Sequence, residues 1–221
     1  MLRGIDVSSH QKGIAVGSLP VDFVISKATE GTGYVNPDCD RVIQDCISNG
    51  ILFGYYHYAR DNGAHAEADY FYENTLGYHG KGVPVLDWEE EQSVEWVNAF
   101  VRRFHEKTGV WCWIYANPWR FNQGGVEQNC GRWIAQYPNV VRPGLDYDLP
   151  EAPETDGLVC CWQYASDGDV PGYDGYLDVN RFFGDKAAWN AYCGKHVENV
   201  ENPGKSVLEN DDFIVEITQK N

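Results

Sequence analysis

The sequence contains no apolar run long enough to cross a membrane. Residues 1–3 lead directly into Gly4-Ile-Asp-Val7, so the apolar core of a secretory signal is also missing from the start of the chain. We therefore expect no membrane insertion. We also expect synthesis in the cytoplasm without export by the usual route.

Basic side chains are scarce: 17 Lys and Arg face 33 Asp and Glu, for a net charge of −16. Attraction to phosphate groups drives nucleic-acid binding, so this charge excludes a nucleic-acid partner. Aromatic residues are abundant by contrast, with 8 Trp, 14 Tyr and 9 Phe. Aromatic faces commonly hold sugar rings or bases, and the negative charge favours sugars.

The cysteines form no CxxC pair, and their number, 7, is odd. This pattern disfavours both a zinc site and a disulfide framework. Cys112, Cys160 and Cys161 lie in apolar stretches, where a free thiol behaves as a small hydrophobic side chain. We expect reduced, buried thiols.

Strands and helices alternate along the first half of the chain, which predicts parallel strands joined by right-handed crossovers. An Asn-Pro pair starts the first helix, and Gly50 and Gly109 end the first and third. Hydrophobic spacing predicts strands at 4–8, 21–26, 51–58, 83–89 and 110–115, and helices at 36–50, 64–76 and 94–109.

The pattern changes after Tyr115, where Pro- and Gly-rich loops join the strands expected at 132–137, 158–164 and 175–179. Antiparallel strands need no crossover helix, so we expect these three to meander and close the sheet. The predicted fold is α/β, a TIM-like flattened barrel with five parallel strands, three antiparallel strands and three main helices.

The last part of the chain differs in composition. Residues 183–193 predict a short closing helix, and a polar, turn-rich segment follows Gly194. We expect one domain over residues 1–194 and an acidic linker or C-terminal extension over 195–221. Within the extension, 213–218 alternates as a strand that either pairs with the barrel or begins a further module.

An acidic motif follows the apolar strand that begins at Val83. Side chains alternate along a strand, so Asp87 and Glu89 point to one place while Trp88 points the opposite way. Like charges held together push one pKa up and the other down, which provides a proton donor and an anion at neutral pH. A carboxylate-rich strand end that merely precedes a helix is the alternative for this stretch.

The carboxyl ends of barrel strands form the functional face of a parallel barrel. Carboxylates at these ends (Asp6, Asp87, Glu89 and Asp178) share the rim with amide and aromatic groups. Such a rim suits a polyhydroxylated ligand. His57 lies there as well, and we interpret it as a hydrogen-bonded rim residue rather than a base.

Several separated motifs occur in the order found in one enzyme family. The sequence resembles the glycoside hydrolase family 25 muramidases, the Chalaropsis-type lysozymes of phage endolysins and bacterial autolysins. The resemblance runs from Gly4 to about Cys193 and rests on Gly4-Ile-Asp-Val-Ser8, Phe23-Val-Ile-Ser-Lys-Ala-Thr-Glu-Gly31, Gly54-Tyr-Tyr-His57, Asp87-Trp-Glu89, Trp133-Ile-Ala-Gln-Tyr137, Trp162-Gln-Tyr164 and Leu177-Asp-Val-Asn-Arg-Phe182.

The resemblance implies cleavage of the β-1,4 bond between N-acetylmuramic acid and N-acetylglucosamine in peptidoglycan, with net retention and with neither metal nor cofactor. Glu89 matches the acid. Asp87 matches its partner, acting as nucleophile or orienting the substrate's 2-acetamido group, and Asp6 and Asp178 match the remaining acidic positions. Weaker matches as substrate-binding residues are Lys27, Glu30, Tyr56, Tyr115, Gln136 and Trp162.

Two other functions use the same residues. A metal-dependent hydrolase would take Asp6, Asp87, Glu89, Asp178 and His57 as ligands, although the sequence has no HxH or HxxxH pair. A non-catalytic cell-wall sugar-binding module would keep the aromatic rim but lose a central acid, and none is lost here.

The absence of a leader fits release to the cell wall in the manner of a phage endolysin. We expect a monomer, with a separate wall-binding module after the linker, because the net charge of −16 opposes approach to an anionic wall.

We predict that lysis of bacterial walls weakens as salt is lowered. Screening extends over about 8 Å at 150 mM salt and about 30 Å at 10 mM, so repulsion between protein and wall grows as salt is removed. Turbidity loss of a cell suspension across this range measures the effect. Faster lysis at 10 mM would contradict the repulsion argument.

Overall fold

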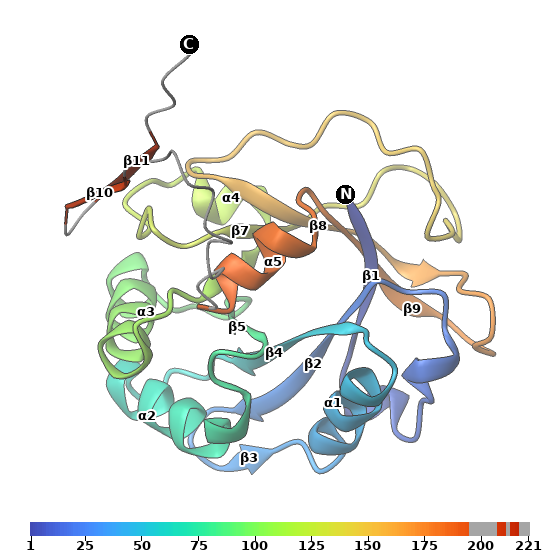
Figure 1. Cartoon of the computed structure of the whole chain (residues 1–221), viewed down its shortest axis with the longest axis horizontal. Helices are drawn as coiled ribbons and strands as arrows, with labels where there is room; N and C mark the ends of the chain where they lie inside the picture. The colour runs from blue at the N-terminus through green and yellow to red at the C-terminus, as the bar shows by residue number, and fades with distance from the viewer. Residues whose placement is uncertain (195–206, 211–212, 217–221) are drawn as a thin grey trace.

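Eight strands close into a barrel in the computed structural model (Figure 1), which describes residues 1–194, 207–210 and 213–216. The pairing of β1 with β2 closes the ring. A short strand, β3 (Tyr34–Val35), pairs with β2 outside it. The order around the barrel is β1 (Leu2–Val7), β9 (Leu177–Phe182), β8 (Val159–Gly168), β7 (Arg132–Ala135), β6 (Trp113–Ala116), β5 (Val83–Asp87), β4 (Leu52–Tyr58) and β2 (Phe23–Glu30).

The predicted α/β barrel is confirmed, but the expected strand directions were wrong in the second half of the chain. Strands β7 and β8 run parallel to β6, so β9 alone among the barrel strands is antiparallel to its neighbours. The reason lies in the connections 117–131 and 136–158, which are long enough to return the chain to the start of the barrel without a full helix. The first contains only the short helix α4 (Pro118–Phe121).

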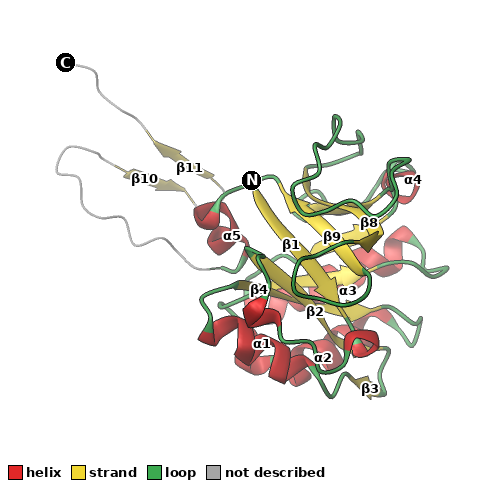
Figure 2. Ribbon diagram, turned by 90° about the vertical axis from the view of Figure 1, so that its right-hand side faces the viewer, coloured by secondary structure: helices red, strands yellow, loops and turns green. Residues whose placement is uncertain are grey.

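Three main helices, as predicted, pack against one side of the barrel: α1 (Cys39–Ser48), α2 (Ala64–Asn74) and α3 (Val94–Thr108) (Figure 2). Helix α3 begins where the Ser93 side chain accepts a hydrogen bond from the Trp96 amide, and ends at Gly109, whose φ is 71°. Its buried residues recur at helical spacing and face the barrel: Val97, Phe100, Val101 and Phe104.

The fifth helix, α5 (Lys186–Tyr192), closes one end of the barrel (Figure 1). Its Trp189 is fully buried, with ring centroids 4.7 Å from Phe23, 5.3 Å from Trp113 and 5.3 Å from Phe182. The first two contacts lie at the amino ends of β2 and β6, and Phe182 ends the antiparallel β9. The amino end of the barrel interior is therefore filled by side chains, which leaves the carboxyl end open.

All seven cysteines are buried, as predicted. Desolvation raises the pKa of the thiols of Cys112, Cys160 and Cys161 well above the ordinary value, because their charged forms would lie in an apolar interior. Among the described residues, no helix is both long and apolar enough to cross a membrane.

Most of the expected extension, 195–221, lies outside the described residues. The predicted strand in it is present as β11 (Phe213–Glu216), which pairs antiparallel with β10 (Val207–Asn210) in a separate two-stranded sheet.

The guanidinium group of Arg132 is buried at the start of β7. It donates to the backbone carbonyl oxygens of Asp156 (2.9 Å), Glu127 (2.8 Å), Cys130 (2.7 Å) and Val126 (3.2 Å). One side chain thus ties both long connections to the barrel.

We predict that Arg132→Met lowers the free energy of unfolding by about 3–5 kcal/mol, because four backbone carbonyl groups, two of them in buried hydrogen bonds, lose their donors. Urea denaturation followed by circular dichroism measures the change. Arg102→Met is the matched control, since its exposed pair with Glu127 contributes about 1 kcal/mol or less. Equal losses in the two variants would contradict this role of Arg132.

Candidate active site

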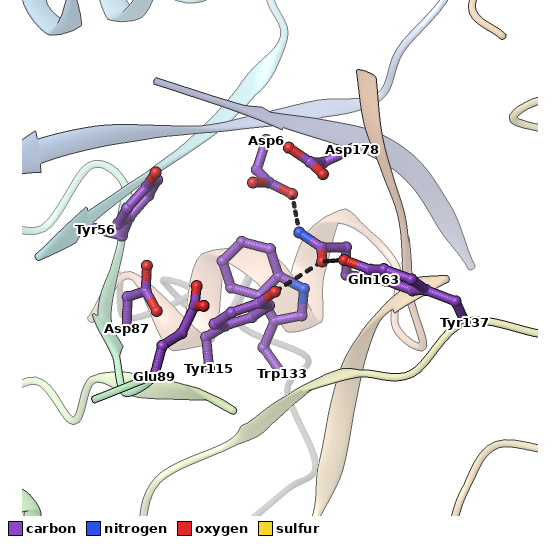
Figure 3. A pocket seen from close by; sticks show the side chains of 9 residues that line it. All are labelled: Asp6, Tyr56, Asp87, Glu89, Tyr115, Trp133, Tyr137, Gln163 and Asp178. Carbon is purple, nitrogen blue, oxygen red and sulfur yellow. Dashed lines mark hydrogen bonds between the residues drawn. The ribbon is translucent and has the colours of Figure 1, made fainter. Parts of the chain in front are cut away.

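A pocket of about 210 Å³ opens at the carboxyl end of the barrel, opposite α5. Residues of seven strand ends or the loops that follow them meet there, which is the arrangement expected of a parallel barrel. The lining residues, all drawn in Figure 3, are Asp6, Tyr56, Asp87, Glu89, Tyr115, Trp133, Tyr137, Gln163 and Asp178.

The carboxylates of Asp87 and Glu89 project side by side into the pocket, as the alternation of the strand predicts (Figure 3). Strand β5 ends at Asp87, and Glu89 follows on the loop. Trp88 points away into the core, where its indole N–H donates to the carbonyl oxygen of Gln92 at 3.0 Å. This buried anchor fixes the backbone between the two carboxylates.

Asp6 and Asp178 face them from the other side of the pocket (Figure 3). They are directly paired in the register of β1 and β9. One oxygen of Asp6 accepts hydrogen bonds from the amides of Gln163 (2.9 Å) and Asn180 (2.7 Å). The carboxylate of Asp6 is therefore held in one orientation.

Aromatic side chains in turn orient both amides. The hydroxyl groups of Tyr115 and Tyr137 each donate to the Gln163 carbonyl oxygen at 2.7 Å. The Trp133 indole donates to Asn180 at 2.8 Å. Because the amide oxygens accept these bonds, the amide nitrogens are directed at Asp6.

The crowding of carboxylates controls their protonation. Burial raises the pKa of Asp87 well above its ordinary value, and the nearby Glu89 carboxylate raises it further. Burial, with Asp6 and Glu89 nearby, raises the pKa of Asp178 to about 8. Burial also raises the pKa of Asp6 to about 6, against the lowering effect of its two amide donors. The pocket therefore holds protons at neutral pH.

One oxygen of Asp87 lacks the hydrogen bonds that hold Asp6 and Gln163 in this pocket. Oδ1 is buried and has no hydrogen-bond partner among the described residues. A buried polar atom without a partner is unfavourable, so it is a natural contact for a hydrogen-bond donor on a ligand.

Of the six residues predicted to bind substrate, Tyr56 and Tyr115 line the pocket, whereas Lys27, Glu30, Gln136 and Trp162 lie outside its lining. Lys27 pairs with Glu30 at the edge of the barrel. Trp162 is buried on the outer face of β8, where its indole donates to the Gln136 carbonyl oxygen at 2.6 Å.

Three lining residues were not among those assigned a catalytic or substrate-binding role: Trp133, Tyr137 and Gln163, although the strand-end pattern places Tyr137 and Gln163 on the rim. The signal that could have found Gln163 is strand alternation, because neighbours on β8 face opposite sides and only one of Trp162 and Gln163 can enter the barrel. Tyr137 lies two residues beyond the end of β7 and enters the pocket on the same side as Trp133, as continued alternation places it.

His57 is fully buried and does not line the pocket. Its two ring nitrogens contact the Thr29 hydroxyl and the Glu67 carboxylate, each at 2.8 Å. The hydrogen-bonded role is confirmed, but the expected position on the rim is wrong, because the ring packs against Phe71 and Phe100 of the helices. The only nitrogen ligand of the metal alternative therefore lies outside the pocket. In the part of the chain that the structure describes, no group of three His, Cys, Asp or Glu is placed to hold a metal ion.

Comparison with known proteins identifies one family. The family model "Glycosyl hydrolases family 25" matches residues 5–173. The chain is 31% identical to lysozyme M1 of Streptomyces globisporus over 211 residues, covering 84% of this chain and 69% of that protein. It is 27% identical to the autolytic lysozyme of Clostridium acetobutylicum over 191 residues, covering 82% of this chain. The chain spans only 56% of the length of that relative.

A solved structure agrees with this. The bacterial lysozyme of Streptomyces coelicolor superimposes with a TM-score of 0.74 at 28% identity, over 87% of this chain and 96% of that one.

We predict that Asp178→Asn stabilises the protein increasingly as pH rises from about 4 to about 8. The pKa of Asp178 is about 8 in the folded state, against an ordinary value of 3.8 for an aspartate, so the folded state retains a proton that the unfolded state loses. Stability is therefore lost as pH rises through this window, and the uncharged variant avoids that loss. We expect a gain of about 1–3 kcal/mol at pH 8 and little at pH 4.

Thermal or urea unfolding at both pH values measures the difference. Asp174→Asn, which removes an exposed carboxylate outside the pocket, is the control and should change stability by less than about 0.5 kcal/mol at either pH. A gain that is the same at pH 4 and pH 8 would show that Asp178 is not the source of the effect.

Proposed function

The chain belongs to the glycosyl hydrolases family 25, and from this membership we propose that it is a lysozyme acting on peptidoglycan. The bond cleaved is the β-1,4 bond from N-acetylmuramic acid to N-acetylglucosamine, with net retention of configuration. The observation that carries the proposal is the pair of carboxylates, Asp87 and Glu89, projecting side by side into a pocket that retains protons.

Glu89 is the proton donor in this proposal. It is the exposed member of the pair and borders the opening, where a glycosidic oxygen can approach it. Asp87 is buried and its pKa is raised, so it holds a proton in the free protein. A substrate that makes Asp87 an acceptor transfers this proton to Glu89.

The substrate's 2-acetamido group is the part of the ligand that can make Asp87 a hydrogen-bond acceptor. Its N–H donates to the unpartnered oxygen of Asp87, which stabilises the carboxylate form. Its carbonyl oxygen then attacks the anomeric carbon as the bond to the leaving oxygen breaks, and Glu89 protonates that oxygen. The attack forms an oxazoline ring fused to the sugar. Glu89 next takes a proton from water, which attacks the anomeric carbon and opens the oxazoline. Two inversions give net retention.

Direct attack by Asp87 is the alternative for the first step. It needs Asp87 ionised and free to reach the anomeric carbon. Burial disfavours the ionised form in the absence of a donor, which supports the acetamido route. Asp6 and Asp178 hold the far side of the sugar and, when ionised, stabilise the positive charge that develops on the ring.

Lysis of the bacterial wall follows as the biological role. The proposal includes release from the cytoplasm to the wall, as in phage endolysins, and a monomeric chain. A separate wall-binding module would offset the repulsion caused by the net charge of −16.

We predict that Glu89→Gln abolishes release of new reducing ends from peptidoglycan, with a loss of about 100-fold or more, because the amide cannot donate a proton in the transition state. Mass spectrometry of the soluble fragments identifies the reducing sugar as N-acetylmuramic acid. The intact protein should give these fragments in the presence of a chelator.

Glu90→Gln is the matched control, since Glu90 is the adjacent carboxylate but pairs with Arg60 and does not line the pocket. Reducing ends on glucosamine, cleavage of peptide bonds, or unchanged release by Glu89→Gln would refute the assignment. Loss of activity to the chelator would support the metal-dependent alternative instead.

A further inference from the structure

A second cleft, of about 600 Å³, lies beside the catalytic pocket between the start of α3 and the loop around α4. Trp88 and Arg120 lie together in it, with the guanidinium carbon 5.1 Å from the indole centroid. The same Arg120 donates to the Glu89 carbonyl oxygen at 2.7 Å. The cleft and the catalytic pocket therefore share one segment of backbone.

The amide of Gln92 lines this cleft without a partner. The residue is 5% exposed, and neither its amide nitrogen nor its amide oxygen has a hydrogen-bond partner among the described residues. A buried amide that is unpaired at both atoms is unfavourable in the free protein. It matches a ligand group that offers one N–H donor and one carbonyl acceptor together.

Trp119 gives the cleft an apolar surface. Its side chain is 69% exposed, an unusual position for the largest apolar side chain. An aromatic face of this kind packs well against the C–H face of a sugar ring. The cleft thus combines an aromatic surface with a buried amide.

The charge of the cleft limits its ligands. Glu91 and Glu95 line it, and the cation Arg120 is already engaged with Trp88 and with the Glu89 carbonyl. An anionic peptide would be repelled by this lining, whereas a neutral sugar would not.

We propose that this cleft is a distal glycan subsite that binds an N-acetylated hexosamine ring of the same strand whose glycosidic bond lies over Glu89. The acetamido group pairs with Gln92, and the ring packs on Trp119. Glu89 lines the pocket and Glu91 lines the cleft, so one glycan strand can follow the backbone segment that borders both. The inference rests on the proposed function, because it assigns a further part of the same substrate.

The test compares peptide-free oligomers of alternating N-acetylmuramic acid and N-acetylglucosamine that differ only in length. A long oligomer reaches both the pocket and the cleft, and a short one fills the pocket alone. We expect Trp119→Ala to lower the ratio of kcat/KM for an octamer to that for a tetramer by about tenfold, because remote binding energy is lost. Leu76→Ala, which truncates an exposed side chain on the helical turn after α2, is the control and keeps the ratio.

A binding measurement complements the kinetics. In a Glu89→Gln background, the side-chain amide signal of Gln92 and the indole signal of Trp119 are assigned in nitrogen–proton spectra by their absence from Gln92→Leu and Trp119→Ala. Both signals should shift when the octamer is added and stay in place with a disaccharide.

Each outcome separates the two proposals. If the intact protein releases no reducing ends from peptidoglycan, the proposed function fails. If it cleaves the oligomers but Trp119→Ala retains the length dependence, only the distal subsite is wrong. The same holds if the Gln92 and Trp119 signals do not shift when the octamer is added. An effect of Trp119→Ala that appears only on substrates carrying peptide stems would also overturn it, because the occupant would then be peptide.

Discussion

Mutual repulsion among four carboxylates of one pocket, two of them buried, is the constraint on which the site depends. Water would normally screen such charges, but the walls of the barrel exclude it from Asp6 and Asp87. The carboxylates can remain together only if some of them keep protons and others receive hydrogen bonds. Asp6 receives hydrogen bonds from Gln163 and Asn180, whereas Asp87 keeps a proton. The site is thereby prepared to move a proton before any substrate arrives.

The rest of the barrel maintains this crowding. Helix α5 and Trp189 fill the amino end, so the barrel interior is a packed core at its amino end and a pocket at its carboxyl end. The aromatic side chains above that core are also hydrogen-bond donors, and Tyr115 and Trp133 fix the amides that in turn fix Asp6. Packing and protonation are therefore linked through the same side chains, because a rotated amide would present an oxygen instead of a nitrogen to the carboxylate.

Strand direction has a direct consequence for function. Because β7 and β8 run parallel to the earlier strands, their carboxyl ends deliver Tyr137 and Gln163 to the same mouth as Asp87. The antiparallel arrangement expected from the loops would have placed the end of β7 at the plugged side. Of the eight barrel strands only β9 runs the other way, and Asp178 reaches the mouth because it lies near the start of that strand.

Hydrophobic period and side-chain alternation are local properties, and they were enough to predict the barrel class, the position of nearly every strand and the shared direction of Asp87 and Glu89. The sequence also brought Asp6 and Asp178 to the same rim. Tertiary structure alone decided the direction of β7 and β8, which depends on where a long loop returns. It also decided that Gln163 rather than Trp162 enters the pocket, and that the His57 ring forms a hydrogen bond with Glu67 outside it. These features depend on contacts between segments far apart in the chain, and local sequence patterns do not predict such contacts.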